Sequence, residues 1–348
     1  MKPINVALCS FGMSGYVFHA PFAAKNPNLN LYAVWERTKN EAEKKYPDII
    51  TFRKLDDLLA DEKIELVIVN TPSVTHYEYA KKALQANKHV IVEKPFVAST
   101  EEATELIALA KKNKLKLSVF HNRRYDSDFK TVQKVLENNS LGQLVEAHIH
   151  YDRYHPGLSP KAHKEVDTAA VGGLYDLGSH LIDQALHLFG KPNAVFADLA
   201  IFRPKAKVVD YFDVKMFYDT FRVTLKSSLF VKEVTTGFTL HGTLGSFVKS
   251  RADVQEAALQ AGDIPGGEGY GIELEKEMGL LHAEIEGREN RIKVPTLAGN
   301  YMEYFDGIVA AIRNDEPLPV TGEEAAMVIE VIEACMTSNQ EKRVVSLT

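Results

Sequence analysis

The feature that most constrains the fold is a regular alternation of short apolar runs and helix-like segments over the first 120 residues. Uninterrupted apolar runs are typical of strands buried on both faces of a parallel sheet, and the segments between them are long enough for crossover helices. The pattern therefore predicts an α/β fold with a doubly wound parallel sheet. We expect strands at 4–9, 29–35, 64–69, 89–93 and 115–120, and helices at 40–45, 56–59, 75–87 and 100–112.

A glycine-containing turn follows the first predicted strand at once, with the sequence Ser10-Phe11-Gly12-Met13-Ser14-Gly15. Gly12 and Gly15 match the second and third glycines of the dinucleotide pattern G-x-G-x-x-G, and Ser10 stands in place of the first. The second glycine lets the backbone approach a pyrophosphate, and the third lets helix and strand pack closely. Strand–helix turns with glycine are common, but this turn opens a β-α series, which favours a dinucleotide site.

The second predicted strand ends in Glu36-Arg37-Thr38, about 20 residues beyond the glycine turn. An acidic residue at this place binds the adenosine ribose hydroxyls of NAD, whereas an arginine accepts the 2′-phosphate of NADP. Because Glu36 and Arg37 are adjacent, the residues leave NAD and NADP as open alternatives, beside the simpler possibility of solvated loop charges.

The run Val90-Ile91-Val92 leads directly into Glu93-Lys94-Pro95. Pro95 ends the strand because it has no backbone N–H to donate. Open α/β sheets bind their ligands at the carboxyl ends of the strands, so Glu93 and Lys94 are predicted at the ligand-binding edge. The alternative is a strand that ends in ordinary solvated charges.

The second part of the chain does not continue the alternation of strands and helices. After a predicted helix at 127–137, strand-like segments lie close together and are separated by short turns, which predicts an α+β domain with an open, mostly antiparallel sheet. We place the domain division between 1–121 and 122–348, and expect 253–291 to be glycine-rich and irregular. The predicted strands are 145–154, 196–201, 213–218, 220–226, 237–240 and 246–249, followed by helices at 301–313 and 322–337.

Asp176, His180, Asp183 and His187 have the spacing of one helical stripe on an otherwise apolar helix. They are either a capping acid and core histidines, or groups that face a ligand, because buried polar groups need partners. Hydride transfer from a carbinol needs a base for the hydroxyl proton, and histidine titrates near neutral pH. Lys94 could polarise the same oxygen. The stripe has no cysteine, and we expect no metal.

Composition limits the class of protein. A net charge of −6 without a basic block argues against nucleic-acid binding. We found no apolar run long enough to span a membrane and no secretory signal, so we expect a cytoplasmic protein. The two cysteines, Cys9 and Cys335, are predicted to be buried thiols, not a disulfide.

Taken together, four motifs resemble the Gfo/Idh/MocA oxidoreductases over nearly the whole chain, from residue 4 to about 343. They are the glycine turn, Asn70-Thr71-Pro72-Ser73, Glu93-Lys94-Pro95 and Asp176-x-x-x-His180. Further segments, including those that begin at His121, Asp210 and His241, resemble the bacterial branch of that family with NADP-dependent scyllo-inositol dehydrogenase.

The resemblance implies an NAD(P)-dependent oxidoreductase that interconverts a hydroxyl and a ketone on a sugar or an inositol-like polyol. It implies Lys94, Asp176 and His180 as the catalytic set, a cis Lys94–Pro95 bond, and a homodimer or homotetramer formed through the open sheet. We expect substrate contacts from Lys94, Tyr154, Asp176 and His180. We expect cofactor contacts from Ser10, Phe11, Gly12, Met13, Ser14, Gly15, Glu36, Arg37, Thr38, Asn70, Thr71, Pro72, His76, Glu93, Lys94, Asn122 and Arg123.

Two other classes of function remain open. One is a catalytically silent, nucleotide-binding regulator on the same fold, against which the intact set of Lys94, Asp176 and His180 argues. The other is an enzyme that uses the nicotinamide transiently, for elimination or glycosidic cleavage. Release of net NAD(P)H during turnover separates a dehydrogenase from this second alternative.

Overall fold

The structure is a computed structural model that describes residues 2–233 and 235–347, and its chain forms two compact units. Unit 1 comprises Met1–Asn122, Gln255–Tyr270 and Asn300–Ala326, and unit 2 comprises Arg123–Val254, Gly271–Gly299 and Met327–Thr348. Two later segments therefore belong with the first 122 residues, and the division at 121 stays a prediction for the functional domains.

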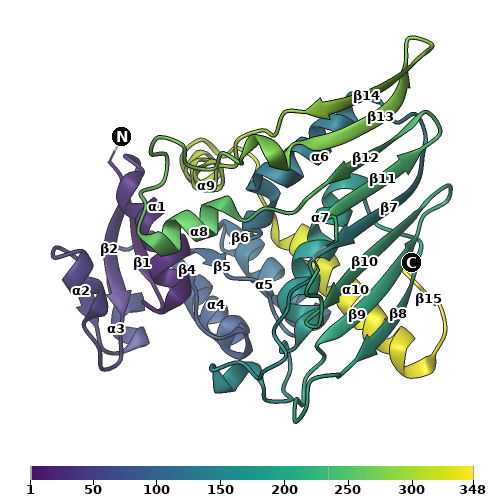
Figure 1. The fold of residues 1–348 in the computed structure, drawn as a ribbon. Helices are drawn as coiled ribbons and strands as arrows, with labels where there is room; N and C mark the ends of the chain where they lie inside the picture. The colour runs from purple at the N-terminus through teal and green to yellow at the C-terminus, as the bar shows by residue number, and fades with distance from the viewer. Residues whose placement is uncertain (1, 234, 348) are drawn as a thin grey trace. The chain divides into compact units, whose positions relative to one another are not determined.

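Unit 1 contains a parallel sheet of six strands in the order β3-β2-β1-β4-β5-β6 (Figure 1). The order reverses between β1 and β4, which is where doubly wound sheets bind their ligands. The predicted parallel sheet is confirmed, with one strand more than expected. The strands are β1 (Ile4–Leu8), β2 (Leu29–Trp35), β3 (Ile50–Phe52), β4 (Leu66–Val69), β5 (His89–Val92) and β6 (Leu117–Val119).

The strands whose residues are buried were predicted from the sequence, and the one with no buried residue was missed. All residues of β1 and β4 are buried, as expected for central strands covered on both faces. The missed strand, β3, has three residues at the sheet edge and none is fully buried, so it lacks an apolar run.

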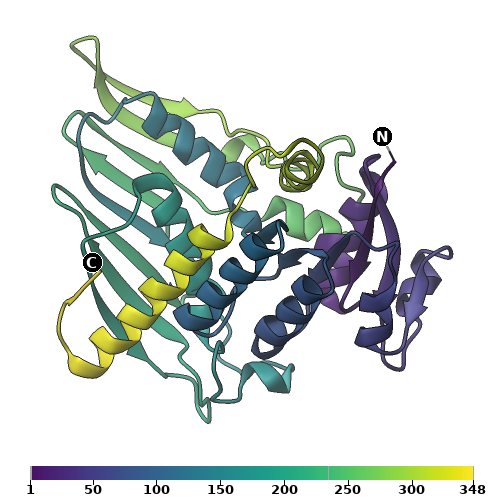
Figure 2. The same cartoon turned by 180° about the vertical axis from the view of Figure 1, so that it is seen from behind.

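The four helices predicted between these strands are present, α1 was not predicted, and α4 and α5 pack side by side (Figure 2). α5 begins at the N-cap Ser99, whose hydroxyl accepts the backbone N–H of Glu102. The helices of unit 1 are α1 (Ala20–Lys25), α2 (Glu41–Lys45), α3 (Leu55–Ala60), α4 (His76–Gln85), α5 (Thr100–Lys112), α8 (Val254–Ala261, from Gln255 on) and α9 (Met302–Asn314).

Helix α9 joins the core of unit 1 through a group of buried aromatic side chains. The rings of Phe22 and Phe305 stack with centroids 5.1 Å apart, and Phe120 meets Tyr304 edge-to-face at 5.0 Å. The Tyr304 hydroxyl also lies 2.8 Å from Ser118 Oγ on β6. These contacts explain why α9, whose Tyr304 lies 186 residues beyond Ser118 in the chain, belongs to unit 1.

Unit 2 contains a nine-stranded sheet in the order β14-β13-β12-β11-β7-β10-β9-β8-β15. Its neighbours pair antiparallel, except that β7 and β10 are parallel. The prediction of a mostly antiparallel sheet is confirmed. The strands are β7 (Leu144–His150), β8 (Ala194–Ala200), β9 (Tyr211–Phe217), β10 (Arg222–Ser228), β11 (Phe238–Gly242), β12 (Gly245–Lys249), β13 (Gly279–Ile285), β14 (Arg288–Val294) and β15 (Val345–Ser346).

Helices α6 (Ser127–Glu137), α7 (Ser179–Phe189) and α10 (Gly322–Glu341, in unit 2 from Met327 on) complete unit 2. Figure 2 shows α6 and α10 across one face of the sheet. Side chains such as Val214, Met216 and Val223 are buried, while their neighbours along the same strands are partly exposed. This alternation is typical of a sheet covered on one face.

The prediction that 253–291 is irregular was wrong for most of the segment and holds for residues 262–274, which lie in no helix or strand. The segment contains the helix α8 and the strand β13, and it ends within β14. β13 and β14 form a hairpin whose turn residues, Glu286 and Gly287, both have positive φ. Neither strand has a continuous apolar run, because only alternate residues at the start of β13 are buried and β14 has no buried residue. In the part of the chain that the structure describes, the helices are too short or too polar to cross a bilayer.

Candidate functional site

The glycine turn is locked to the loop after β4. Asn70 Oδ1 accepts the backbone N–H of Ser10 at 3.0 Å, Asn70 Nδ2 donates to the Ser10 carbonyl at 2.9 Å, and Ser10 Oγ donates to the Asn70 carbonyl at 3.0 Å. Serine in the first glycine position thus adds one hydrogen bond, from Oγ, that a glycine would lack, while the other two use the backbone of residue 10. The contacts join two predicted cofactor residues across the carboxyl ends of β1 and β4.

The two glycines of the turn, Gly12 and Gly15, are needed for different reasons. A Cβ on Gly15 would lie 2.4 Å from the Ser10 carbonyl oxygen, so the fold itself demands glycine there. A Cβ on Gly12 would meet only Ser10 Oγ, at 3.8 Å, which is an ordinary contact. The protein therefore leaves room above Gly12. Such room fits the close approach of a pyrophosphate, for which the second glycine of a dinucleotide turn exists.

Glu36 follows β2 and is buried, and its carboxylate faces the start of α2. One carboxylate oxygen accepts the backbone N–H of Glu41 at 3.2 Å, and the other accepts that of Ala42 at 3.0 Å. These N–H groups have no partner inside the helix, and a negative charge there is stabilised by the helix dipole. Arg37 and Thr38, by contrast, are exposed.

Arg53, a residue that the sequence analysis missed, holds the loop after Glu36. Its guanidinium donates to the carbonyl oxygens of Glu36 at 2.8 Å and Lys39 at 2.6 Å, and to the side chain of Asn40. Its own carbonyl accepts the indole N–H of Trp35 at 3.2 Å. One arginine thereby shapes the segment that presents Arg37 and Thr38. No local motif marks it, because it lies in the loop between β3 and α3.

Glu93 and Lys94 lie where β5 ends, and Lys94–Pro95 is a cis peptide bond, as the resemblance implied. Glu93 Oε1 lies 2.8 Å from both Ser14 Oγ and His19 Nε2, and Glu93 Oε2 accepts the backbone N–H of Lys94 at 3.1 Å. Burial by itself raises the pKa of Glu93, but the hydrogen bonds and charges of His19, Ser14 and Lys94 prevail and lower it to about 2. Glu93 is therefore a buried carboxylate.

His76 fixes the backbone on the other side of Lys94. Its Nδ1 lies 2.8 Å from the Pro95 carbonyl oxygen, and its Nε2 lies 2.9 Å from that of Thr71. Burial lowers its pKa although the two carbonyl groups favour the proton. The imidazole joins the loops after β4 and β5. The predicted cofactor contact of His76 stays a prediction.

In unit 2, Asp176 and His180 lie on consecutive segments of different helix type. Asp176 belongs to a π-helical turn, η5 (Leu174–Gly178), and His180 to the first turn of α7. The prediction of one α-helical stripe was therefore wrong at its start. Asp176 Oδ2 lies 2.8 Å from Lys164 Nζ and is half exposed, whereas His180 is buried. π-Helical turns are often found at functional sites.

The other two residues of the predicted stripe, Asp183 and His187, contact side chains of unit 2. Asp183 accepts hydrogen bonds from Arg124 Nε and Nη2 at 2.6–3.2 Å, and both side chains are buried. The ring of His187 packs against Phe129, with centroids 5.9 Å apart.

Among residues 2–233 and 235–347, no three His, Cys, Asp or Glu side chains are grouped to hold a metal ion.

Three other predicted site residues are placed as follows. Asn122 is buried in unit 1. The guanidinium of Arg123 forms ion pairs with Asp126 at 3.3 Å and Asp253 at 2.7 Å in unit 2. Tyr154 is exposed, and Lys232 Nζ lies 4.7 Å from the centre of its ring. Their predicted contacts with cofactor or substrate stay predictions.

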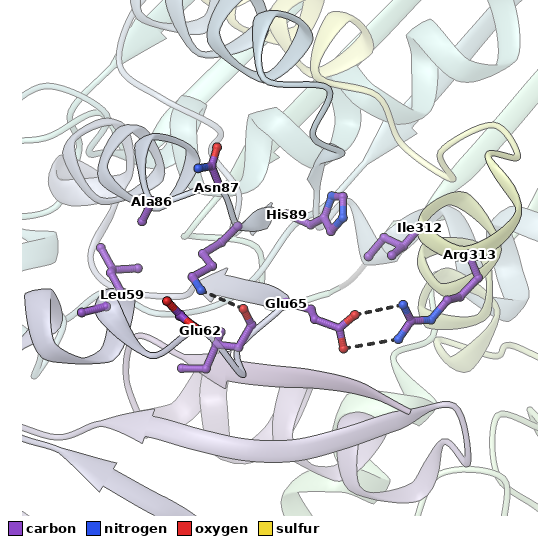
Figure 3. A pocket seen from close by; sticks show the side chains of 11 residues that line it. Leu59, Glu62, Glu65, Ala86, Asn87, His89, Ile312 and Arg313 are labelled. Carbon is purple, nitrogen blue, oxygen red and sulfur yellow. Dashed lines mark hydrogen bonds and ion pairs between the residues drawn. The ribbon is translucent and has the colours of Figure 1, made fainter. Parts of the chain in front are cut away.

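Unit 1 has a hollow of about 670 Å³ whose lining includes neither the glycine turn nor Glu93 and Lys94 (Figure 3). Its lining includes Ile64 and Glu65, which precede β4, and His89, which begins β5, so it lies at the amino ends of these strands. There Arg313 forms a bidentate ion pair with Glu65, and Lys88 Nζ donates to the carbonyl oxygens of Asp61 and Ile64. These contacts are internal and structural. We therefore do not assign the hollow to the cofactor, which binds at the opposite edge of such sheets.

Comparison with known proteins covers both parts of the chain. Residues 4–121 match the family model described as an oxidoreductase family with an NAD-binding Rossmann fold, and residues 133–347 match the model of the C-terminal α/β domain of the same family. Both models bear the name Gfo/Idh/MocA.

Similar individual proteins span the whole length. The chain is 38% identical over 345 residues to the Bacillus subtilis (strain 168) protein named scyllo-inositol 2-dehydrogenase (NADP(+)) IolW, with 99% of this chain and 96% of that protein covered. A crystal structure from Bacteroides fragilis NCTC 9343 is 45% identical, with a TM-score of 0.91 over 99% of this chain and 100% of that one. An oxidoreductase from Bacillus cereus is 33% identical, with a TM-score of 0.91 over 99% of both chains.

Proposed function

This chain belongs to the Gfo/Idh/MocA family of oxidoreductases, and from that premise we propose that it is an NADP-dependent dehydrogenase or reductase. Its proposed reaction interconverts a hydroxyl and a ketone on a sugar or an inositol-like cyclic polyol. The observation that carries the proposal is the arrangement of Lys94, whose backbone N–H is held by a buried carboxylate beside the glycine turn. The name of the Bacillus subtilis relative supports the choice of substrate class.

The protein's own residues have separable roles in this reaction. When bound, the nicotinamide supplies the chemistry of hydride transfer. In the direction of oxidation, His180 accepts the proton of the substrate hydroxyl, and in reduction it returns that proton. The ammonium group of Lys94 donates a hydrogen bond to the same oxygen and stabilises the negative charge that develops on it. Asp176 orients the substrate or the imidazole of His180.

The residues after β2 support NADP as the preferred cofactor. Each carboxylate oxygen of Glu36 already accepts a backbone N–H at the start of α2, and the side chain is buried. Burial and these two hydrogen bonds make Glu36 less accessible to the ribose hydroxyls of NAD than an exposed carboxylate would be. Arg37 is exposed on a loop held by Arg53, and a guanidinium is well suited to bind a 2′-phosphate.

The sheet of unit 2 supports a homodimer or homotetramer. On its face opposite the buried side chains, Phe196 lies directly across from Lys215, and Phe217 stands across from Arg222. Phe196 is 37% exposed, and partly exposed aromatic groups are frequent in subunit interfaces. Phe196→Glu should therefore shift the protein to a smaller species in sedimentation velocity. An unchanged sedimentation coefficient for a folded variant would contradict this interface.

A direct test uses a panel of inositols, inososes and aldoses with NAD and NADP, followed at the absorbance band of the reduced nicotinamide. We expect net formation or consumption of NADPH with at least one cyclic polyol or its ketone. If NADPH binds but no member of the panel changes its net amount, the dehydrogenase assignment is wrong for this substrate class. Product formation without net NADPH change would instead indicate transient use of the cofactor.

A further inference from the structure

His19 is a fully buried histidine that the reaction scheme does not use. It ends the π-helical segment η1 (Gly15–His19), which follows the glycine turn directly. Its Nε2 lies 2.8 Å from Glu93 Oε1. Its Nδ1 is buried and has no hydrogen-bond partner in the described part of the chain. A polar ring in such surroundings costs free energy unless its hydrogen bond compensates.

The proton of His19 can be located from its partner. Glu93 is a carboxylate with a pKa of about 2, and a carboxylate can only accept hydrogen bonds. His19 Nε2 must therefore carry the proton that it donates. The ring lies against Phe120, with centroids 4.6 Å apart, and meets Phe305 at 6.2 Å. Aromatic packing thus sets the plane of the imidazole and aims Nε2 at Glu93.

Glu93 connects three parts of unit 1 through one carboxylate. Ser14 Oγ of the glycine turn donates to Oε1, His19 of η1 donates to the same oxygen, and the backbone N–H of Lys94 donates to Oε2. The orientation of the carboxylate therefore fixes the position of the Lys94 backbone, and with it the direction in which the Lys94 side chain starts. Without His19, Ser14 would be the remaining side chain to hold Oε1, and Ser14 also lies in the predicted cofactor turn.

We propose that His19 is a positioning residue that orients Glu93 and, through it, Lys94, so that the glycine turn and the catalytic lysine keep one fixed relation. The inference rests on the proposed function, because it assigns Lys94 to the reacting oxygen. His19 itself contacts neither substrate nor cofactor in this scheme.

Two amide substitutions distinguish hydrogen bonding from packing. The amide group of glutamine reaches about as far as Nε2 of histidine, whereas that of asparagine reaches only as far as Nδ1. His19→Gln should therefore keep the donor to Glu93, while His19→Asn and His19→Phe should lose it. We expect kcat to fall roughly 10- to 100-fold in the asparagine and phenylalanine variants, with recovery in the glutamine variant. The dissociation constant for NADPH, measured by fluorescence, should change much less than kcat.

A second measurement does not depend on any substrate. The rate of reductive methylation of Lys94, followed by peptide mass spectrometry, reports the surroundings of its ammonium group. We expect the rate in His19→Asn and His19→Phe to differ from the wild type by several-fold, and that in His19→Gln to match it. If these variants do not fold, Ser14→Ala removes the other donor to Glu93 Oε1, and we expect its rate of Lys94 methylation to differ from that of the wild type by several-fold.

The outcomes separate the two claims. Equal labelling rates and equal kcat in the wild type and all folded variants would overturn the role of His19. A wild type that reduces or oxidises no cyclic polyol, together with variant-dependent labelling of Lys94, would overturn the proposed substrate class and leave the positioning role supported. Equal losses in the asparagine and glutamine variants would show that ring packing, not the hydrogen bond to Glu93, is what matters.

Discussion

The carboxylate of Glu36 lies 3.0 Å from the backbone nitrogen of Ala42, at the start of the helix that follows it. A residue whose place in the sequence predicts ribose binding is thus bonded to its own neighbouring helix. The exposed cation beside it, Arg37, is the group that we propose selects between the two nicotinamide cofactors.

Arg37→Ala should weaken NADP selectively. Loss of a charge-assisted contact to a phosphate should raise KM for NADP roughly 10- to 100-fold and leave KM for NAD within a factor of about three. Steady-state kinetics with both cofactors measure this. Lys39→Ala is the matched control, since it removes a nearby exposed cation but keeps the carbonyl that Arg53 binds. An equal loss for both cofactors would reject the role of Arg37.

Arg53→Ala should also weaken NADP binding, because Arg53 holds the loop that contains Arg37. The substitution removes three hydrogen bonds from the segment between β2 and α2, so the position of Arg37 should become less defined. We expect KM for NADP to rise by about 10-fold, with partial recovery in Arg53→Lys, which restores the charge but not the planar fork. Unchanged cofactor kinetics in a folded alanine variant would contradict this role.

Lys94→Ala should abolish most of the catalytic rate. If Lys94 stabilises charge on the reacting oxygen, kcat should fall roughly 100- to 1,000-fold while the dissociation constant for NADPH stays nearly constant. Lys81→Ala, on the surface helix α4, is the control for loss of a lysine with an ion pair. Turnover that survives in Lys94→Ala would exclude this function of the lysine.

The low pKa of Glu93 predicts a pH-dependent contribution to stability. Its folded pKa of about 2 lies below that of an unfolded glutamate, about 4.3, so its stabilising effect is complete above the unfolded value. The effect is lost as pH falls from there toward 2, and amounts to on the order of 3 kcal/mol. The difference in thermal stability between wild type and Glu93→Gln should therefore shrink between pH 5 and pH 3. A constant difference would contradict this contribution.

The ion pair between Arg124 and Asp183 should matter for stability far more than a surface pair. Both side chains are buried, so Asp183→Asn removes a buried negative charge that the guanidinium of Arg124 binds, and should cost about 3–5 kcal/mol. Glu330→Gln, which breaks the partly exposed pair with Lys191, should cost at most about 1 kcal/mol. Denaturant titrations measure both. Similar small losses would mean that the buried pair is dispensable.

Local sequence patterns predicted much of the fold, and they failed where burial is weak. The central strands β1 and β4 are buried throughout and almost entirely apolar, and β2, α5 and α6 have the predicted limits. The edge strands β3 and β14 were missed, because strands with little buried surface need no apolar run. β13 was missed as well, although its Leu281 and Ala283 are buried. Their stability comes from pairing with neighbours, which the local pattern does not encode.

By itself, the sequence determined the fold class, the glycine turn and the choice of Lys94, Asp176 and His180 as candidates, since each depends on short-range pattern or motif. Only the tertiary structure decided which polar groups are already bonded. It placed His19 beside Glu93, 74 residues away, and Arg53 against the loop after Glu36. The physical reason is that strand order brings distant loops together at one edge of the sheet. A carboxylate's role depends on the donors it meets there, not on its neighbours in the chain.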